Sequence, residues 1–424
     1  MKFLFVSPEA LSIDLAHVVR QEGNEVKFFI HSVTEKDVGD GFVEKVDSWE
    51  DQTDWADVIV FDDIGFGKPA EKLRADGKSV VGGSIYTDRL ENEREFGQQE
   101  LAKAGVSVLP NWNFSDFEEA IKFVQGNPGR YVIKPSGRAQ NEKELLFVGQ
   151  EEDGNDVINV LAHYKKNWSN KIKIFQIQQF SSGVEVAVGA FFNGKDFVLP
   201  VNINFEHKRL FPGNIGPSTG EMGTLMFWNK RGRIFEMTLD KMKSALAASG
   251  YAGYIDVNCI ANGTGIYPLE FTSRFGYPTI SIQMEGITSR WDRLLHSLAK
   301  GENAELHTKK GFQLGVVIAV PPFPFNDDRT FRKFSEDATI LFKTQNLDGI
   351  HLGEVKRDGN DWRIAGRSGY SLVVTGSGNT TLEAREQAYR RVTNIMIPNL
   401  FYRTDIGSGW VRDSDLLLSY GYLQ

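Results

Sequence analysis

Short apolar runs alternate with amphipathic stretches over residues 1–105. The runs read as strands in KFLFV, EVKFFI, DVIVFDD and SVVGG, and the segments LSIDLAHVVRQEG and PAEKLRADG have the spacing of helices with one buried face. A regular alternation of strands and helices predicts a doubly wound parallel sheet. Residues 1–105 are therefore expected to form an α/β domain.

The pattern changes at about residue 106. A lid is expected at about residues 130–190, where the order strand, strand, helix, strand, strand occurs in RYVIKPSG, ELLFVG, DVINVLAHYKKNWS, KIFQIQQF and VEVAVGAFFNG. This order predicts a small α+β unit within a domain of residues 106–310. Residues 311–424 are expected to form a small α+β carboxyl-terminal domain, so the chain is predicted to be an α/β and α+β multidomain protein.

Two segments of the middle domain concentrate polar chemistry. Residues 206–223, EHKRLFPGNIGPSTGEMG, combine glycines and prolines with basic residues and show no apolar period, which is typical of a long functional loop. The segment YIDVNCIANGTGIYPLEFT then reads as a hairpin. It places Asp256 and Glu270 on paired antiparallel strands.

Composition narrows the class of protein. The chain has 424 residues, 41% of them hydrophobic and 12% aromatic, which is enough for roughly two to four folded domains. A formal charge of -8 without basic runs argues against nucleic acid or an anionic membrane as the main partner. The single cysteine, Cys259, excludes an internal disulfide and a multi-cysteine metal site. We expect a cytoplasmic protein, because neither a signal peptide nor a membrane span is recognisable.

The turn after the first strand bears on cofactor class. A dinucleotide-binding sheet would place a glycine fingerprint there, whereas this chain has Ser7-Pro8-Glu9-Ala10-Leu11-Ser12. A nicotinamide or flavin cofactor is therefore not expected. Asp62 and Asp63 follow the third strand, where open sheets place ligands, although acids at strand ends can also cap a turn.

The paired acids and one lysine suggest a nucleotide site. Two carboxylates on neighbouring strands are costly to bury unless a cation neutralises them, and neither strand carries a lysine or arginine. Magnesium prefers one or two carboxylates together with phosphate oxygens, so Asp256 and Glu270 beside Lys134 of the lid fit Mg²⁺ bound to a nucleoside triphosphate. Two of these residues also have a plainer interpretation: Glu270 could be a surface acid and Lys134 a solvated edge lysine.

Three motifs resemble the phosphoribosylamine–glycine ligase family of the ATP-grasp superfamily. They are EHKR at 206–209, GPSTGEMG at 216–223 and EFTSRFGYPT at 270–279, where the family has DHKR, GPNTGGMG and EFNxRFGDPE. The order of these motifs after the strand that ends in Lys134 also matches the family, and the likeness continues through the carboxyl-terminal part of the chain. The resemblance implies an ATP-dependent ligase that joins a carboxylate to an amine through an acyl phosphate, with glycine as the expected carboxylate donor.

The resemblance also implies roles for individual residues. ATP, Mg²⁺ (or Mn²⁺) and small amino-acid and amine substrates are the implied partners. Lys134 and Lys143 would hold ATP phosphates, Gln178, Gln179 and Phe180 would meet adenine, and Glu185 would lie near the nucleotide. Asp256 and Glu270, with Thr272 in place of the family's asparagine, would hold the metal. Arg274, Lys208 and Arg209 would be catalytic, and Arg274 and the loop of residues 216–223 would face the acyl phosphate. Gly216, Thr219 and Gly220 of that loop would also bind the nucleotide.

The departures from the family pattern gather on the side of the amine substrate. Pro8 lacks an N–H and Glu9 is anionic, so the turn that faces a ribose phosphate in the family would receive a phosphate poorly. Tyr277 and Thr279 replace two acids, and the tyrosine could offer a stacking surface. We therefore expect an acceptor other than phosphoribosylamine, unless Arg20, Lys68 or Arg89 supplies the missing positive charge. A nucleotide-binding relative without turnover and a purely structural protein are the remaining alternatives.

Overall fold

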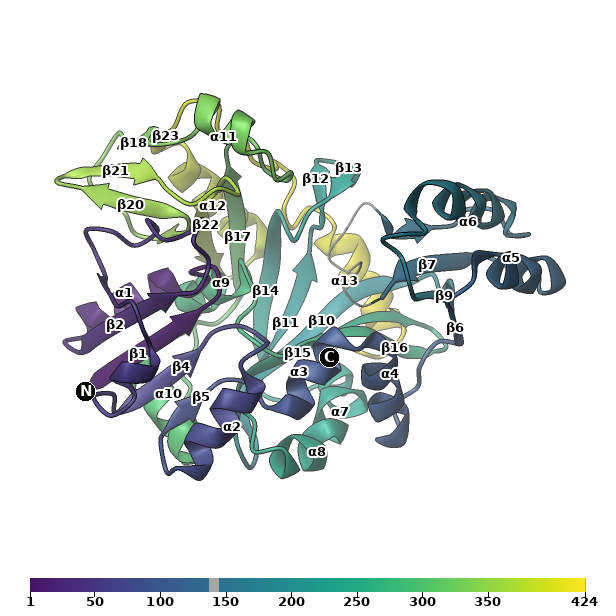
Figure 1. Cartoon of the computed structure of the whole chain (residues 1–424), viewed down its shortest axis with the longest axis horizontal. Helices are drawn as coiled ribbons and strands as arrows, with labels where there is room; N and C mark the ends of the chain where they lie inside the picture. The colour runs from purple at the N-terminus through teal and green to yellow at the C-terminus, as the bar shows by residue number, and fades with distance from the viewer. Residues whose placement is uncertain (137–144, 424) are drawn as a thin grey trace.

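The computed structural model describes residues 1–136 and 145–423 (Figure 1). Its amino-terminal part is a five-stranded sheet of order β3-β2-β1-β4-β5, and every pair is parallel. The predicted doubly wound sheet is therefore confirmed. Its elements are β1 (Lys2–Ser7), α1 (Ile13–Gln21), β2 (Glu25–Ile30), β3 (Glu44–Lys45), the short 3₁₀ helix η1 (Glu50–Gln52), β4 (Val58–Phe61), α2 (Gly67–Ala75) and β5 (Val80–Val81). Two helices, α3 (Ile85–Asn92) and α4 (Arg94–Lys103), lead out of it.

A small four-stranded sheet follows, with the order β6-β9-β7-β8. Its elements are β6 (Asn111–Phe114), α5 (Phe117–Gly126), β7 (Tyr131–Pro135), β8 (Phe147–Val148), α6 (Asn155–Trp168) and β9 (Phe175–Gln179). The helices α5 and α6 share an apolar core with one face of this sheet, and the unit projects from one end of the molecule (Figure 1). The first two strands of the expected lid, β7 and β8, pair antiparallel. The sheet also takes in β6, which precedes the expected lid.

The central element is an eight-stranded sheet of order β16-β15-β10-β11-β14-β17-β22-β19. The strands are β10 (Val184–Asn193), β11 (Phe197–Glu206), β14 (Gly223–Asn229), β15 (Ala252–Asn262), β16 (Gly265–Thr272), β17 (Phe312–Ala319), β19 (Ile350–Leu352) and β22 (Tyr370–Gly378). The strand VEVAVGAFFN, expected in the lid, is β10 of this sheet, so that expectation is wrong. The sheet also runs without a break across the expected boundary at residue 310.

The remaining elements surround the central sheet (Figure 1). The loop expected at 206–223 contains a short antiparallel pair, β12 (Arg209–Phe211) and β13 (Ile215–Ser218). A second four-stranded sheet has the order β20-β21-β18-β23, with β18 (Thr339–Phe342), β20 (Val355–Asp358), β21 (Asp361–Ile364) and β23 (Ile395–Met396). The other helices are α7 (Arg233–Met237), η4 (Leu239–Met242), α8 (Lys243–Ala248), α9 (Thr279–Gly286), α10 (Trp291–Lys300), α11 (Asp328–Phe334), α12 (Thr381–Val392) and α13 (Trp410–Ser419).

Candidate active site

The two predicted metal-binding acids lie on one face of the central sheet. The antiparallel register of β15 and β16 sets Asp256 opposite Thr272 and Asn258 opposite Glu270. Residues two apart on a strand point to the same face, so Asp256 and Glu270 are diagonal neighbours on that face. The predicted hairpin and the placement of both carboxylates on it are confirmed.

Protein cations reach Glu270 from outside the hairpin. The Arg94 guanidinium lies 3.7 Å from Glu270 Oε2, and Lys208 Nζ lies 3.8 Å from Glu270 Oε1. Neither strand of the hairpin carries a lysine or arginine, so the two cations come from α4 and from the segment between β11 and β12, which are distant in sequence. The sequence around Arg94 contains no motif from which its place beside Glu270 could have been predicted.

Lys208 is held by carboxylates from three strands. Its Nζ lies 2.8 Å from Glu185 Oε1 on β10 and 3.3 Å from Glu206 Oε2 at the end of β11, besides its contact with Glu270 on β16. Burial disfavours the charged ammonium, but these three acids outweigh that effect and raise the pKa of Lys208 well above its usual value. Lys208 is thus a fixed positive charge on the polar face of the sheet.

Lys134 is a second lysine of the site, and its pKa is shifted in the opposite direction from that of Lys208. Lys134 lies on β7 opposite Gln176 and is only 6% exposed, so the alternative of a solvated edge lysine is wrong. Burial lowers the pKa of Lys134 to about 7, and the neighbouring Arg94 adds to this effect. The carboxylates of Glu270 and Glu185 act in the opposite direction. An anion at this position would favour the charged form and draw a proton onto the lysine.

Among the residues that the structure describes, none forms with Asp256 the close ion pairs that Glu270 has. Asp256 is 3% exposed, and the hydroxyl of Tyr254 donates to its Oδ2 at 3.3 Å. Burial, with Glu206 and Glu91 nearby, raises the pKa of Asp256 well above its usual value, while a hydrogen bond from Thr272 opposes the rise. Its Oδ1 is buried without a hydrogen-bond partner in the described structure. A buried carboxylate oxygen without a partner is a suitable metal ligand, and Thr272 supports that carboxylate.

The two carboxylates Asp256 and Glu270 fit a metal ion that is bound together with a phosphate group better than a metal ion held by protein side chains alone. Within the described residues, no three acidic, histidine or cysteine side chains are grouped so as to hold an ion by themselves. Magnesium is commonly bound by one or two carboxylates with phosphate oxygens and water completing its shell. Asp256 and Glu270 fit that arrangement.

The residues expected at adenine lie at the end of β9. Gln178 is 1% exposed, and its Nε2 has no partner in the described structure. Gln179 is exposed, and the ring of Phe180 lies under the Arg130 guanidinium at 3.5 Å. Lys143, expected to contact ATP phosphates, lies outside the described residues.

The glycine-rich loop is anchored beside Lys208. The N–H and hydroxyl of Thr219 both donate to the carbonyl oxygen of Lys208, at 2.8 and 2.9 Å. Arg209 donates to the carbonyl of Gly216 at 3.0 Å, a contact within the loop that leaves its predicted catalytic role without further support. Gly216 has φ +83°, and Gly220 has open space where a side chain would project. The loop backbone at Gly220 can therefore be approached closely by a ligand.

Arg274 links the polar face to the amino-terminal sheet. Its Nε lies 2.9 Å from Asp63 Oδ1 and 3.0 Å from Glu91 Oε1. The N–H of Ser273 also donates to Glu91, at 2.7 Å. Burial disfavours the charged guanidinium, but the two acids outweigh it and raise the pKa of Arg274.

Sequence reasoning missed several acids around this site. The sequence motifs assign Glu206 no role beyond its place in EHKR. Glu221, 6% exposed, stands where the family has a glycine. Burial raises the pKa of Glu221 well above its usual value, and Glu206 adds to the rise. Comparing each motif position with the family pattern would have singled out Glu221. Glu91 gave no such signal, because its contact with Arg274 joins segments far apart in the chain.

Tyr277 does not present a free stacking face. Its ring packs against Tyr370 with centroids 4.2 Å apart. The expected use of this tyrosine to stack on a planar substrate therefore finds no support in its packing.

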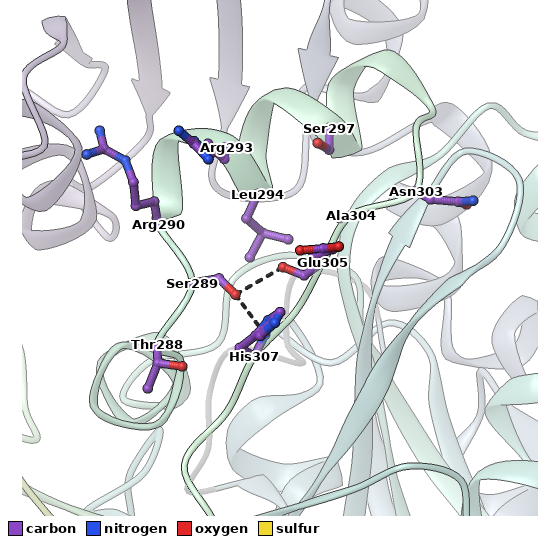
Figure 2. A pocket seen from close by; sticks show the side chains of 10 residues that line it. All are labelled: Thr288, Ser289, Arg290, Arg293, Leu294, Ser297, Asn303, Ala304, Glu305 and His307. Atoms are coloured by element: carbon purple, nitrogen blue, oxygen red, sulfur yellow. Dashed lines mark hydrogen bonds between the residues drawn. The ribbon is translucent and has the colours of Figure 1, made fainter.

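A surface hollow of about 470 Å³ lies between α10 and residues 303–307 (Figure 2). The Ser289 hydroxyl accepts from the His307 N–H at 2.7 Å and donates to the Glu305 carbonyl at 3.0 Å. Arg290 binds Asp292, and Figure 2 shows its side chain directed away from these groups. None of the residues lining this hollow belongs to the polar face described above, so we do not assign the active site to it.

Known proteins share both the sequence pattern and the fold. The family model "Phosphoribosylglycinamide synthetase, ATP-grasp (A) domain" matches residues 92–280. The chain is 26% identical to phosphoribosylamine–glycine ligase of Streptococcus pneumoniae (strain ATCC BAA-255 / R6) over 344 residues, 79% of this chain and 80% of that protein. It is also 26% identical to the Listeria monocytogenes serotype 4b enzyme of that name over 349 residues, 80% of each chain.

Two solved structures place the fold. The crystal structure of phosphoribosylamine–glycine ligase from Thermotoga maritima superposes with a TM-score of 0.72 at 21% identity, covering 96% of this chain and all of that one. A biotin carboxylase–β-γ-ATP complex from Campylobacter jejuni gives 0.64 at 12% identity, covering 99% and 98%. In the described part of the chain, no helix has the length and apolar character that a membrane span needs.

Proposed function

We propose that this protein, a divergent member of the phosphoribosylamine–glycine ligase family of ATP-grasp enzymes, joins glycine or another amino acid to an amine through an ATP-derived acyl phosphate. Family membership makes it an ATP-dependent ligase that forms C–N bonds. The observation that carries the proposal is the meeting of Lys134, Lys208, Asp256 and Glu270 from four segments of the chain. Those charges match the needs of phosphoryl transfer.

The cations and the acids would have different roles in binding ATP. Lys134 and Lys208 would balance the negative charge of the phosphates, and positive charge placed at the transferring group stabilises its transition state. Asp256 and Glu270 would hold Mg²⁺, supported by Thr272, and the ion would neutralise charge on the phosphate oxygens. Gln178, Gln179 and Phe180 would meet the adenine.

The proposed reaction has two steps, formation of an acyl phosphate and its displacement by the amine. A carboxylate oxygen of the amino acid attacks the γ-phosphorus of ATP, the bond from that phosphorus to ADP breaks, and an acyl phosphate forms. The amine nitrogen next attacks the acyl carbon, the bond to phosphate breaks, and the nitrogen loses a proton. Arg274, with the loop around Thr219 and Gly220, would face the acyl phosphate. Both steps need water kept from the reactive intermediate.

An ADP-release assay with glycine and hydroxylamine tests the proposal. Hydroxylamine is small and uncharged near neutral pH, and it converts an acyl phosphate to a stable hydroxamate whichever amine is the natural acceptor. We expect ADP and hydroxamate in equal amounts, both dependent on the amino acid. If ATP binds but neither product forms with glycine or with other amino acids, the protein is a nucleotide-binding relative without turnover.

A further inference from the structure

The turn after β1 has little capacity left to bind a phosphate. The N–H of Leu11 donates to Ser7 Oγ at 3.2 Å, and the N–H of Ser12 donates to Asp62 Oδ2 at 2.9 Å. Pro8 has no N–H to offer. Phosphate sites at the start of a helix depend on free backbone N–H groups. Here the protein's own oxygens occupy two of those groups.

Two of the three candidate replacement cations, Arg20 and Arg89, are engaged elsewhere. Arg20 donates to the carbonyl of Phe42 at 2.6 Å. Arg89 pairs with Glu93 at 2.9 Å and lies over the ring of Phe96. Neither contact involves the turn after β1, so the structure gives no sign that these arginines compensate for Pro8 and Glu9.

Four carboxylates, Glu9, Glu35, Asp63 and Glu354, form what we call the acidic cluster. A side chain added at Gly366 would meet both Glu35 Oε2 at 2.2 Å and Glu354 Oε2 at 2.8 Å, so these two carboxylates are next to each other. Burial, together with the neighbouring carboxylates Glu35 and Glu9, raises the pKa of Glu354 to about 8. Glu9 also acts on Asp63, whose pKa is raised chiefly by burial.

Backbone groups hold the cluster in place. The N–H of Arg367 donates to Glu35 Oε2 at 3.2 Å, and the N–H of Ser368 donates to Glu354 Oε2 at 3.1 Å. The Arg367 guanidinium itself binds Asp328 at 2.7 Å. Glu35 and Glu354 are therefore fixed by neutral donors, while the neighbouring Arg367 guanidinium is directed to a different partner.

A buried hydroxyl gives independent evidence that a ligand group belongs here. Tyr370 is 8% exposed, and its hydroxyl has no hydrogen-bond partner in the described structure. That hydroxyl interacts electrostatically with Tyr277, with Glu221 of the glycine-rich loop and with Glu354 of the acidic cluster. Buried hydroxyls are almost always hydrogen-bonded, so an unpartnered one under the influence of these acids points to a donor or acceptor supplied from outside the protein.

The acidic cluster is continuous with the candidate active site. Asp63 pairs with Arg274 at 2.9 Å, and Arg274 in turn interacts with Asp256 on the polar face of the central sheet. An amine substrate could therefore reach the acyl phosphate with one end while its other end lies among the acids. This relation ties the cluster to acceptor binding rather than to a separate site.

We propose that the amine acceptor carries a second cationic group, as an alkyl diamine does, and that Glu9, Glu35, Asp63 and Glu354 bind that group. This inference rests on the ligase function proposed above. A cation among four acids gains charge-assisted hydrogen bonds and relieves their mutual repulsion, whereas a phosphate there is repelled. The second ammonium replaces the ribose phosphate as the recognised end of the acceptor.

Amide formation from glycine with a panel of probes tests the inference. The panel is putrescine, n-butylamine of matched chain length, γ-aminobutyrate with an anionic end, freshly generated phosphoribosylamine, and hydroxylamine. We expect kcat/KM for putrescine to exceed that for n-butylamine by about tenfold or more, the usual effect of one charge-assisted hydrogen bond. We expect γ-aminobutyrate and phosphoribosylamine, which both carry an anionic group, to have the lowest kcat/KM of the four larger amines.

Substitution of Glu9 adds a second readout. Glu9 is exposed, so Glu9→Gln and Glu9→Lys should leave the fold intact. We expect the ratio of putrescine use to hydroxylamine use to fall about tenfold in Glu9→Gln and further in Glu9→Lys. Glu44→Gln, an exposed acid on β3 outside the cluster, is the matched control and should keep the ratio.

The outcomes separate the two proposals. Hydroxamate formation with equal use of putrescine and n-butylamine, or with efficient use of phosphoribosylamine, overturns the cationic acceptor and leaves the ligase function standing. A putrescine preference that Glu9→Lys does not change also overturns the assignment of the cluster. Absence of hydroxamate with every amino acid overturns the ligase function, and the inference falls with it.

Discussion

Lys208 Nζ, in the segment between β11 and β12, lies 2.8 Å from Glu185 Oε1 on β10. This contact fixes an ammonium on the polar face of the central sheet without any ligand present. Glu206 and Glu270 share the same ammonium, so three acids neutralise a charge that ATP phosphates would otherwise attract. Binding of ATP with a metal would let the metal take over part of those acids and release the lysine to the phosphates. Nucleotide and metal are therefore expected to bind cooperatively.

Lys134→Met should impair ATP use strongly while leaving the fold intact. Methionine keeps the length of the buried side chain and removes the ammonium, so the loss reports on charge at the phosphates. We expect turnover to fall about 10²-fold or more, the effect of losing one preorganised group at a transferring phosphoryl. Lys122→Met, at an exposed lysine of α5 in the same unit, is the control. Equal activity of the two variants would contradict the role given to Lys134.

ATP binding should also take up a proton at Lys134. Because burial lowers the pKa of Lys134 to about 7, the side chain is largely neutral above that pH in the free protein. Phosphates favour its charged form, so ATP affinity should fall as pH rises from about 7 to about 9. Calorimetry in buffers with different ionisation enthalpies measures the uptake. Lys134→Met should abolish it, and an unchanged uptake in that variant would assign the proton to another group.

Glu270→Gln should weaken Mg·ATP binding and slow turnover. The amide keeps the size of the side chain but loses the charge that a hard cation prefers. We expect a fall in rate of about 10²-fold or more. Lys208 retains Glu185 and Glu206, so thermal stability should change little. Titration of Mg²⁺ at fixed ATP compares this variant with Glu44→Gln, and the same Mg²⁺ dependence in both would contradict the metal assignment.

Asp62→Asn should change how stability depends on pH. Asp62 is fully buried, its Oδ2 accepts from the Ser12 N–H and hydroxyl, and burial raises its pKa to about 7. Between about pH 4 and 7 the folded protein holds a proton that the unfolded chain releases, so this group lowers the free energy of unfolding as pH rises. Asparagine keeps an acceptor and cannot titrate.

Urea denaturation at several pH values measures this effect. The variant should be the more stable protein at about pH 8, by an amount on the order of 1–4 kcal/mol, and the difference should shrink toward about pH 5. A constant difference between the two proteins across that range would contradict the buried titration of Asp62.

The sequence predicted the parts of the fold that depend on local pattern. The parallel amino-terminal sheet and the hairpin with Asp256 and Glu270 follow from runs whose period matches one kind of element. The assignment of β10 to the lid failed because a strand pattern does not say which sheet the strand joins. The β12–β13 pair was hidden by glycine and proline, and β17 and β22 joined the central sheet through pairings between distant segments.

The same limit applies to the candidate site. Lys134 and Glu185 could be placed from motifs, because each lies in a segment that resembles a family pattern. Arg94 could not, because its position beside Glu270 depends on how α4 packs against β16, and Gln98 of α4 bonds to the carbonyls of Pro268 and Leu269. The acidic cluster likewise joins residues far apart in the chain, as the neighbouring carboxylates of Glu35 and Glu354 show. Such contacts are set by tertiary packing, and no local pattern encodes them.

Transfer of an oxygen atom from the amino acid to phosphate tests the central claim most directly. If a carboxylate oxygen attacks the γ-phosphorus, that oxygen stays on phosphorus when the amine displaces phosphate from the acyl carbon. Glycine labelled with oxygen-18 in both carboxylate oxygens should therefore yield one labelled phosphate for each amide or hydroxamate formed, as measured by mass spectrometry. Unlabelled phosphate released with ADP at the same rate with and without an amino acid would instead mean that the protein hydrolyses ATP without activating a carboxylate, and would contradict the account.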